Sequence, residues 1–260
     1  MSDWEYPLMR KAGALLAEVG MILYEAVKPG VTPLELDALA EEEILKRGAL
    51  SAFKGYRQGQ PTPFPATLCI SVNDVIIHGI PDDRPFVPTK WGQVPSQMGD
   101  LVSIDMGLIY QGYYADHAWT KVVSTPDTEN MPLLISMTHM AMMEGIEAAQ
   151  PGNRIGDIGA AIQKVAEQFQ VGIVHEYAGH GIGRRLHESP TVPNFGRAGK
   201  GLLLKPGMAL AIEPMFTVGS PETVLDDDGW TVRTKDGSAA CHFEHTILIT
   251  QKGPEILTLP

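Results

Sequence analysis

Apolar residues near the start of the chain recur at the spacing of a helix that buries one face. They are Leu8, Leu15, Leu16, Val19, Ile22, Leu23 and Val27, and this spacing places them on one side of an α-helix. Pro29 and Gly30 are expected to end that helix. A second helix is predicted to follow Thr32, because Pro33 and Glu35 then occupy the first-turn and capping-box positions.

Shorter patterns predict the remaining elements. Two further helices are expected over residues 131–149 and 155–165. Strands are expected where a short run is apolar and compatible with extended backbone, at 66–72, 101–104, 171–174, 207–212 and 246–250. Segments rich in Pro, Gly and Gln are expected to be loops, at 57–65 and 81–99.

The order of elements and polar residues repeats in the two halves of the chain. Each half opens with a helix, a Pro-Gly break and a second helix, then carries a His-Gly pair, a glycine six residues before an acid, and a second acid. These residues are His78, Gly99, Asp105 and Asp116 in the first half and His180, Gly207, Glu213 and Glu244 in the second. We therefore expect one domain over residues 1–260, with halves of about 1–125 and 126–260 related by pseudo-twofold symmetry around a central site.

Composition narrows the class of protein. The chain has 260 residues and 44 % hydrophobic residues, as expected for a globular domain. Its net charge of −11 argues against binding to nucleic acid or to an acidic membrane. Two cysteines, Cys69 and Cys241, provide no disulfide framework. Neither a secretory signal nor a membrane span is recognised, so we expect a cytoplasmic protein.

Two acids lie at matching positions after apolar runs. Asp105 follows the run 101–104 and Glu213 follows the run 208–212. A buried carboxylate is unfavourable unless a positive group meets it, and four converging carboxylates would repel one another. Two divalent ions remove that repulsion. One imidazole with four carboxylates suits Mn²⁺, Fe²⁺ or Co²⁺, and Zn²⁺ can also bind such a set.

The segment 179–190 combines glycines with two histidines, His180 and His187. It lacks the residues of a nucleotide-binding loop, so its glycines are expected to let the backbone pass close to a metal or substrate. The other histidines are expected to have packing or supporting roles. Strand alternation places His242 on the same side as Glu244, and His245 on the opposite side.

Several stretches together resemble a known family. They are 73–81, the acids Asp105 and Asp116 eleven residues apart, 179–190, 206–214 and 243–246. In these stretches the chain closely resembles the type I methionine aminopeptidases of the bacterial kind, and the similarity runs from about residue 4 to 258. The resemblance implies an α/β (α+β) pita-bread fold, also called creatinase/aminopeptidase-like, with pseudo-twofold symmetry.

The resemblance also implies an activity, which is metal-dependent removal of the initiator methionine from nascent proteins with a small second residue. Its site residues would fall into four groups. The ligands of two divalent ions would be Asp105, Asp116, His180, Glu213 and Glu244; the catalytic groups His78, His187 and Glu213; the substrate pocket His78, His187, Cys69, Tyr56 and Trp230; and a loop for one monovalent cation would contain Asn73 and Val75. The partner would be the N-terminal methionine of nascent chains, met at the ribosome. The protein would be a monomer.

Some positions depart from the family pattern. Residues 57–63 and 86–98 look like insertions, Leu186 replaces a common aromatic residue, and Phe53 stands where a small residue or Cys is usual. Two alternatives stay open. An Xaa-Pro aminopeptidase of the same fold usually carries an extra N-terminal domain, for which a first helix starting near residue 7 leaves no room. A non-catalytic peptide-binding module usually lacks metal ligands.

Overall fold

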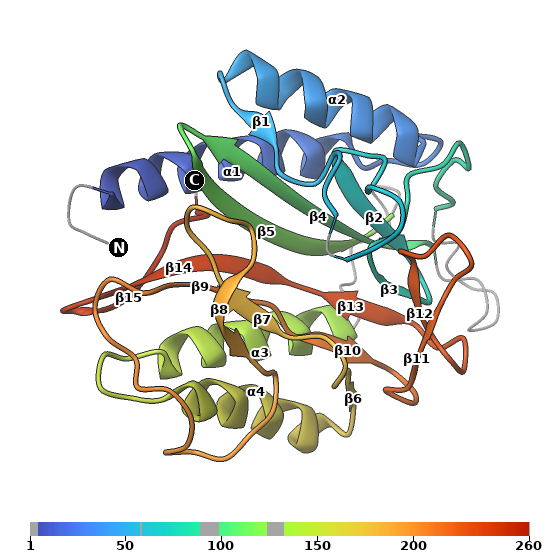
Figure 1. Cartoon of the computed structure of the whole chain (residues 1–260). Helices are drawn as coiled ribbons and strands as arrows, with labels where there is room; N and C mark the ends of the chain where they lie inside the picture. Colours follow the sequence, from blue (N-terminus) through green and yellow to red (C-terminus); the bar gives the residue numbers. More distant parts are fainter. Residues whose placement is uncertain (1–4, 58, 89–98, 124–132, 260) are drawn as a thin grey trace.

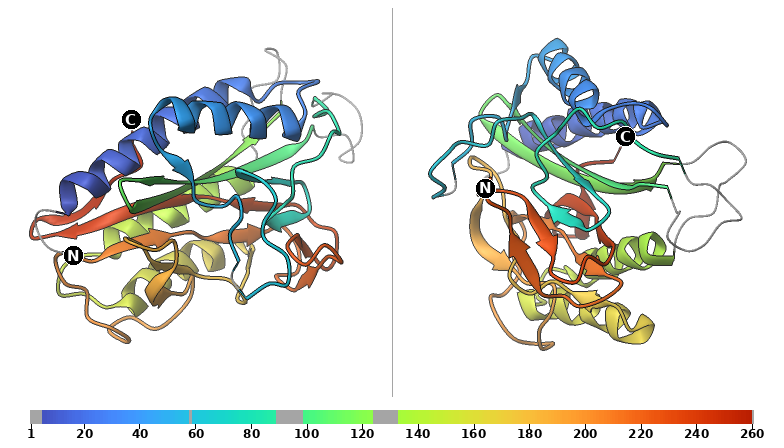
Figure 2. Two further views of the ribbon diagram at one scale, coloured as in Figure 1. Left: turned by 45° about the horizontal axis from the view of Figure 1, so that its top comes forward. Right: turned by 90° about the vertical axis from the view of Figure 1, so that its right-hand side faces the viewer.

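The structure, a computed structural model, describes residues 5–57, 59–88, 99–123 and 133–259. Its main feature is a curled antiparallel sheet with one pair of helices packed against each half, as Figures 1 and 2 show. One pair is α1 (Tyr6–Ala26) and α2 (Pro33–Lys46), and the other is α3 (Leu133–Ala148) and α4 (Ile155–Phe169). Helix α1 packs on β4 (Leu101–Tyr110) and β5 (Tyr113–Val122), whereas α3 packs on β9 (Ala209–Ile212), β13 (Ala240–His242) and β14 (Glu244–Thr250). The prediction of a mixed α/β fold is confirmed.

The main sheet has nine strands, and all of its pairings are antiparallel. Its order is β1-β4-β5-β14-β9-β7-β8, with β2 added beside β4 and β15 beside β14. The bounds are β1 Leu50–Ser51, β2 Leu68–Val72, β4 Leu101–Tyr110, β5 Tyr113–Val122, β7 Gly179–Gly181, β8 Glu188–Val192, β9 Ala209–Ile212, β14 Glu244–Thr250 and β15 Gly253–Ile256.

Two three-stranded sheets flank the main sheet. One has the order β13-β10-β6 and the other β11-β12-β3. Their bounds are β3 Val75–Ile77, β6 Gly172–Ile173, β10 Met215–Thr217, β11 Thr223–Leu225, β12 Val232–Thr234 and β13 Ala240–His242. Among the described residues, no helix is long and apolar enough to cross a membrane.

The helix signals in the sequence correspond to real caps. The Thr32 hydroxyl accepts a hydrogen bond from the Glu35 amide at 3.2 Å, and the Glu35 carboxylate accepts one from the Thr32 amide at 2.8 Å. This is the predicted capping box, and Pro33 occupies the first turn. Gly30 has a φ of 86°, which suits the turn that separates α1 from α2.

The predicted strands lie at the right positions, but their bounds differ from those in the structure. The run 101–104 is only the first part of β4, which continues to Tyr110 and turns into β5 through Gln111 and Gly112. Both turn residues have positive φ, 49° and 83°, as a two-residue hairpin turn requires. The run 66–72 starts its strand at Leu68, and 246–250 belongs to a strand that starts at Glu244. Most of the predicted insertion 86–98 lies outside the described residues.

Two glycines on the buried face of α1 provide a matched test of this packing. A Cβ on Gly13 would lie 2.3 Å from the Leu257 carbonyl oxygen, whereas a Cβ on Gly20 would lie 3.4 Å from the Met106 sulfur. Alanine usually stabilises a helix interior by about 0.5–1 kcal/mol relative to glycine. We expect Gly20→Ala to keep or raise the free energy of unfolding, and Gly13→Ala to lower it by about 1–3 kcal/mol. Urea unfolding of both variants measures this, and a Gly13→Ala protein as stable as the wild type would contradict the close contact.

Candidate metal centre

Strand register brings three acids to one face of the main sheet. Asp105 on β4 and Glu244 on β14 are both register partners of Ala118 on β5, from opposite sides. Cys69 on β2 is in turn the partner of Asp105. Residues directly opposite in a sheet point to the same side, and so does Asp116, two residues before Ala118. The small side chain of Ala118, which is fully buried, leaves space between the two carboxylates that flank it.

The second half of the chain adds an acid and a histidine. Glu213 directly follows β9, and His180 lies in the middle of β7. The Nε2 atom of His180 is 3.5 Å from Glu213 Oε1 and 3.9 Å from Asp116 Oδ2. Asp116, His180 and Glu244 offer ligand atoms that all lie within 4.8 Å of one another. Asp105 lines the same cavity, so the structure brings together all five residues predicted as ligands.

His180 is oriented as a metal-binding imidazole would be. Its Nδ1 donates a hydrogen bond to the Gly181 carbonyl oxygen at 2.9 Å, which leaves Nε2 free to face the carboxylates. Burial, with the neighbouring His187 ring, lowers the pKa of His180 to about 3. The ring is therefore neutral at neutral pH, and a neutral ring nitrogen is the form that binds metals.

The four carboxylates are strained electrostatically as they stand. Burial is the main cause that raises their pKa values, and repulsion from Asp116 adds to it for Asp105, Glu213 and Glu244. The pKa of Asp116 rises to about 7. Two buried oxygens, Asp105 Oδ1 and Glu244 Oε1, have no hydrogen-bond partner. No lysine or arginine is among the described residues that line this cavity. The negative charge of the four carboxylates is therefore not balanced by a basic side chain there, and bound cations would balance it.

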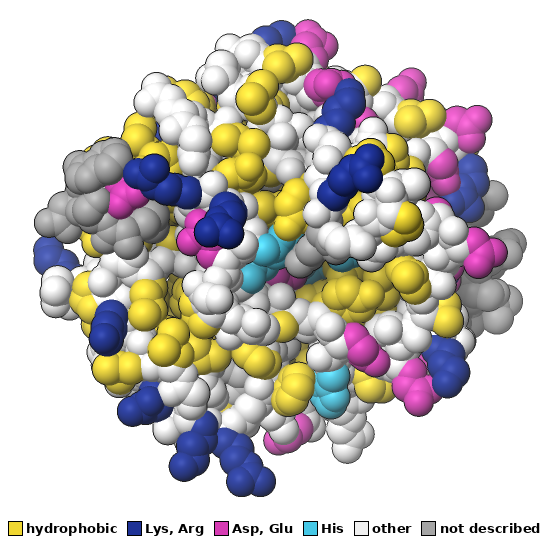
Figure 3. Space-filling model, viewed as in Figure 1, with side chains coloured by type: hydrophobic (Ala, Val, Ile, Leu, Met, Phe, Trp, Pro, Cys, Tyr) yellow, Lys and Arg dark blue, Asp and Glu magenta, His cyan; other side chains and the backbone are white. Residues whose placement is uncertain are grey.

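The acids lie in a cavity that opens into a wide cleft. The inner cavity has a volume of about 50 Å³ and the outer cleft about 1210 Å³, and both are lined by His78, His180, His187, Glu213 and Trp230. Figure 3 shows histidine side chains in a hollow near the middle of one face. The inner cavity is further lined by Phe53, Tyr56, Phe64, Cys69, Asp105, Asp116, Leu186 and Glu244. Its wall thus combines the acids with apolar and aromatic side chains.

Two histidines lie between the acids and the cleft. The Nδ1 atom of His187 is 2.5 Å from the Tyr56 hydroxyl oxygen, and its ring lies 4.2 Å from that of His180. His78 has a φ of 58°, which is uncommon for a residue with a side chain. Its ring meets the Trp230 ring edge-on at 6.2 Å. Burial lowers the pKa of His78 and His187 to about 4, so both rings are neutral at neutral pH.

The glycines on either side of His180 are needed for packing within the sheet. A Cβ on Gly179 would lie 2.3 Å from the Ala211 carbonyl oxygen, and a Cβ on Gly181 would lie 2.3 Å from the Ser189 carbonyl oxygen. Both close approaches are therefore to the backbone of neighbouring segments. These glycines let the strand that carries His180 lie between its neighbours.

The supporting histidines lie on the reverse face of the sheet. His117 and His245 are register partners whose rings stack at 4.7 Å. His117 Nδ1 donates to the Glu244 carbonyl oxygen at 2.6 Å, so it holds the backbone of a candidate ligand. His242, for which a packing or supporting role is expected, lies on the side of the acids, with its Nε2 3.7 Å from Glu213 Oε2. The spacing His-x-Glu puts two residues on one face of an extended chain, and the side predicted for His242 by strand alternation agrees with this placement.

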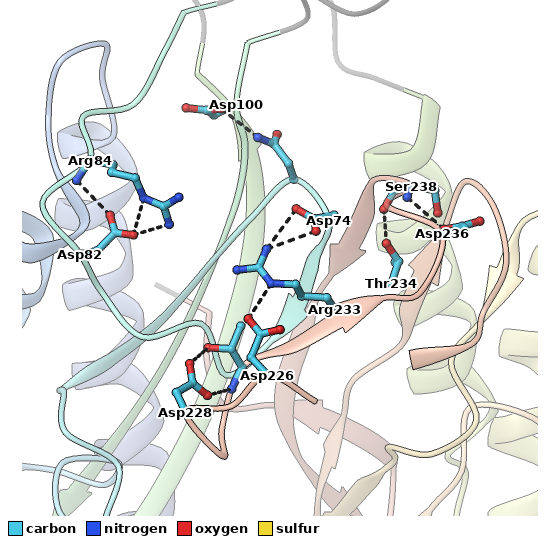
Figure 4. A network of polar contacts seen from close by, with 12 residues as sticks. Asp74, Asp82, Arg84, Asp100, Asp226, Asp228, Arg233, Thr234, Asp236 and Ser238 are labelled. Atoms are coloured by element: carbon cyan, nitrogen blue, oxygen red, sulfur yellow. Dashed lines mark hydrogen bonds and ion pairs between the residues drawn. The ribbon is translucent and has the colours of Figure 1, made fainter. Parts of the chain in front are cut away.

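A polar network connects the Trp230 segment to the turn before β3, as Figure 4 shows. Arg233 bonds to Asp74 in that turn and to Asp226 before Trp230. Asp228 accepts a hydrogen bond from the Trp230 amide at 2.7 Å. The network therefore fixes a pocket residue against the strand that leads to His78.

Comparisons with known proteins agree with this geometry. The model of metallopeptidase family M24 matches residues 7–251. The chain is 45 % identical to a methionine aminopeptidase of Aquifex aeolicus over 99 % of this chain and 97 % of the relative. It is 42 % identical to methionine aminopeptidase 1 of Bacillus subtilis over 98 % and 96 %. The crystal structure of methionine aminopeptidase from Rickettsia prowazekii superposes with a TM-score of 0.90 at 40 % identity, covering 100 % of this chain and 98 % of that chain.

These matches define the class of protein, a metallopeptidase of family M24 with the predicted pita-bread fold. Within that class, the chain belongs to the methionine aminopeptidases. The prolidase from Pyrococcus furiosus is 22 % identical with a TM-score of 0.72, and the chain covers 65 % of it. That likeness extends to the fold alone.

Proposed function

We propose that this protein hydrolyses the first peptide bond of polypeptides that begin with methionine, and that two divalent ions in its central site take part. The convergence of Asp105, Asp116, His180, Glu213 and Glu244 carries the proposal. The chain is a metallopeptidase of the methionine aminopeptidase family, so removal of the N-terminal methionine is the activity that this site serves. The number of ions and their identity, Mn²⁺, Fe²⁺, Co²⁺ or Zn²⁺, are part of the proposal.

The acids and His180 would hold the ions. Divalent ions at such a site lower the pKa of water toward neutrality and polarise a carbonyl oxygen. Glu213 is partly buried, and its Oε1 faces His180 while its Oε2 faces His242. We assign it the proton transfer, from the attacking water to the leaving amine. Asp105, the register partner of Cys69 on one side and of Ala118 on the other, would lie beside the free amino group of the substrate.

Two neutral histidines would position the scissile bond. When the Tyr56 hydroxyl donates a hydrogen bond to Nδ1 of His187, the proton of the neutral His187 ring is on Nε2. That Nε2 can then donate to the developing oxyanion. His78, with its ring against Trp230, would hydrogen-bond the scissile amide. An apolar slot formed by Cys69, Trp230 and their neighbours would take the methionine side chain, whose flexible thioether suits such a surface.

The class of substrate, the location and the oligomeric state are proposed as well. The substrates would be nascent chains with a small second residue, met at the ribosome in the cytoplasm by a monomer of one domain. A monovalent cation near Asn73 and Val75 also stays a prediction. Of the two alternatives, Xaa-Pro cleavage rests on fold likeness only, and a non-catalytic module does not account for the five converging groups.

Methionine release from two short peptides tests the function. We expect metal-free protein to be inactive, and Mn²⁺ or Co²⁺ to restore release from Met-Ala-Ser, with at least tenfold slower release from Met-Leu-Ser. His180→Ala should abolish the metal-dependent activity, since it removes an imidazole from the cluster. Release from Xaa-Pro peptides but not from Met-Ala-Ser would contradict the proposal and favour the Xaa-Pro alternative.

A further inference from the structure

The structure contains a second imidazole at the acid cluster, that of His242. This residue ends β13 and is 1 % exposed. Its amide donates to the Thr120 hydroxyl at 3.1 Å, and its carbonyl oxygen accepts from the same hydroxyl at 2.6 Å. Thr120 lies on β5, the strand that carries Asp116. The backbone of His242 is therefore held against a strand of the metal centre.

The side chain of His242 faces the acids and is not satisfied by the protein. Its Nε2 atom is buried without a hydrogen-bond partner and lies 3.7 Å from Glu213 Oε2. Glu244 Oε1 is also buried without a partner. Buried polar atoms are nearly always bonded to something. Two unpartnered atoms in one cluster therefore indicate a missing ligand between them.

The geometry forms a second ligand group beside the expected one. Glu213, His242 and Glu244 offer ligand atoms within 4.8 Å of one another, and so do Asp116, His180 and Glu244. Glu244 belongs to both groups. Glu213 lies between the two imidazoles, with Oε1 toward His180 at 3.5 Å and Oε2 toward His242 at 3.7 Å. Each group thus has two carboxylates and one imidazole nitrogen.

We propose that His242 is an additional metal ligand, and that its Nε2 binds a divalent ion together with Glu213 and Glu244. The inference rests on the proposed metal-dependent function. It changes the donor set of the centre from one nitrogen to two. Imidazole favours Co²⁺, Fe²⁺ and Zn²⁺, whereas an all-oxygen set suits Mn²⁺ better. His242 should therefore shift the preference of one ion position toward Co²⁺.

Metal affinity in the absence of substrate tests the role of His242. We would titrate the full-length wild type, His242→Gln and His175→Gln with Co²⁺ and with Mn²⁺ by calorimetry. His175 is an exposed histidine that packs against Phe195, so it controls for loss of an imidazole elsewhere. We expect His242→Gln to weaken one Co²⁺ site at least tenfold and one Mn²⁺ site less, and His175→Gln to bind as the wild type does. Unchanged affinities in His242→Gln would overturn the proposal.

A crystal of the wild type soaked in Co²⁺ provides the second measurement and needs no variant to fold. Anomalous density should place one ion about 2.0–2.3 Å from His242 Nε2. Ions that all lie beyond roughly 3 Å from Nε2, outside any coordination distance, would overturn the role of His242 and leave the peptidase function standing. A wild type that binds no ion in either measurement would overturn both proposals together.

Discussion

Glu213→Gln is expected to lower kcat for Met-Ala-Ser by about 10²–10⁴-fold, the usual contribution of a positioned general acid–base group. Glutamine keeps the shape of the side chain and one oxygen for a metal, but it cannot accept and return a proton. The two oxygens of Glu213 face His180 and His242 at 3.5 and 3.7 Å, so the residue lies at the centre of the cluster. Free methionine is measured at several Mn²⁺ and Co²⁺ concentrations, so that weaker metal binding is separated from slower chemistry.

Glu147→Gln is the matched control for this prediction. Glu147 is exposed on α3, and the same loss of charge there should leave kcat within about twofold of the wild type. If Glu213→Gln retains more than about a tenth of wild-type kcat at saturating metal, Glu213 does not carry out the proton transfer.

Local signals in the sequence predicted the fold well where an element is long or has a defined end. The capping box at Thr32 and Glu35 and the helical spacing of α1 are examples, and both are confirmed. Several strands of two or three residues, such as β3 and β10, were not predicted because so short a run has no measurable period. The turn of the β4–β5 hairpin was not located from the sequence, because Gln111–Gly112 is not among the usual turn pairs.

That hairpin explains why the two acids of the first half are eleven residues apart. Tyr110 pairs with Tyr113 across the turn, and this register places Asp105 opposite Ala118. Asp116 then lies two residues from Ala118, on the same face as Asp105. The spacing was noticed as a motif, but its physical cause is visible only once the turn and register are known.

The spacing along the chain does not show how the two acids of the second half come together in space. Glu213 and Glu244 are joined by a long excursion through β10 to β13, and only the pairing of β14 with β9 brings them together. Alternation did predict the side on which His242 lies, but not that it reaches the acids. That outcome depends on the backbone bonds between His242 and Thr120, which come from long-range packing.

The metal-free protein is expected to lose stability as the pH rises above about 6.5. Carboxyl groups with raised pKa values, such as Asp116 at about 7, bind a proton in the folded chain that they have lost in the unfolded chain. Their stabilisation is present at low pH and is lost as the pH rises through the folded pKa. Buried histidines act in the opposite sense, because the pKa of His180 falls from 6.5 to about 3. Their contribution is complete above pH 6.5, where only the carboxyl effect remains.

The expected slope follows from proton linkage. The free energy of unfolding should fall by about 1.4 kcal/mol per pH unit for each proton by which the folded chain exceeds the unfolded one. With Mn²⁺ or Co²⁺ bound, the slope should vanish or reverse, because the acids bind ions in their deprotonated form. Urea unfolding at pH about 6.5, 7.5 and 8.5, with chelator and with metal, measures both slopes.

Two substitutions distinguish the effect of the buried acids on the pH dependence of stability from the effect of an exposed acid. Asp116→Asn removes a group that titrates at about 7, so it should flatten the metal-free slope and raise metal-free stability at high pH while weakening the response to metal. Asp227→Asn, at an exposed position, should leave both curves unchanged. If the metal-free stability instead rises between pH 6.5 and 8.5, the pKa values of the buried acids are not raised. Repulsion among the acids would then be too weak to raise their pKa values, and its relief would not explain stabilisation by the metals.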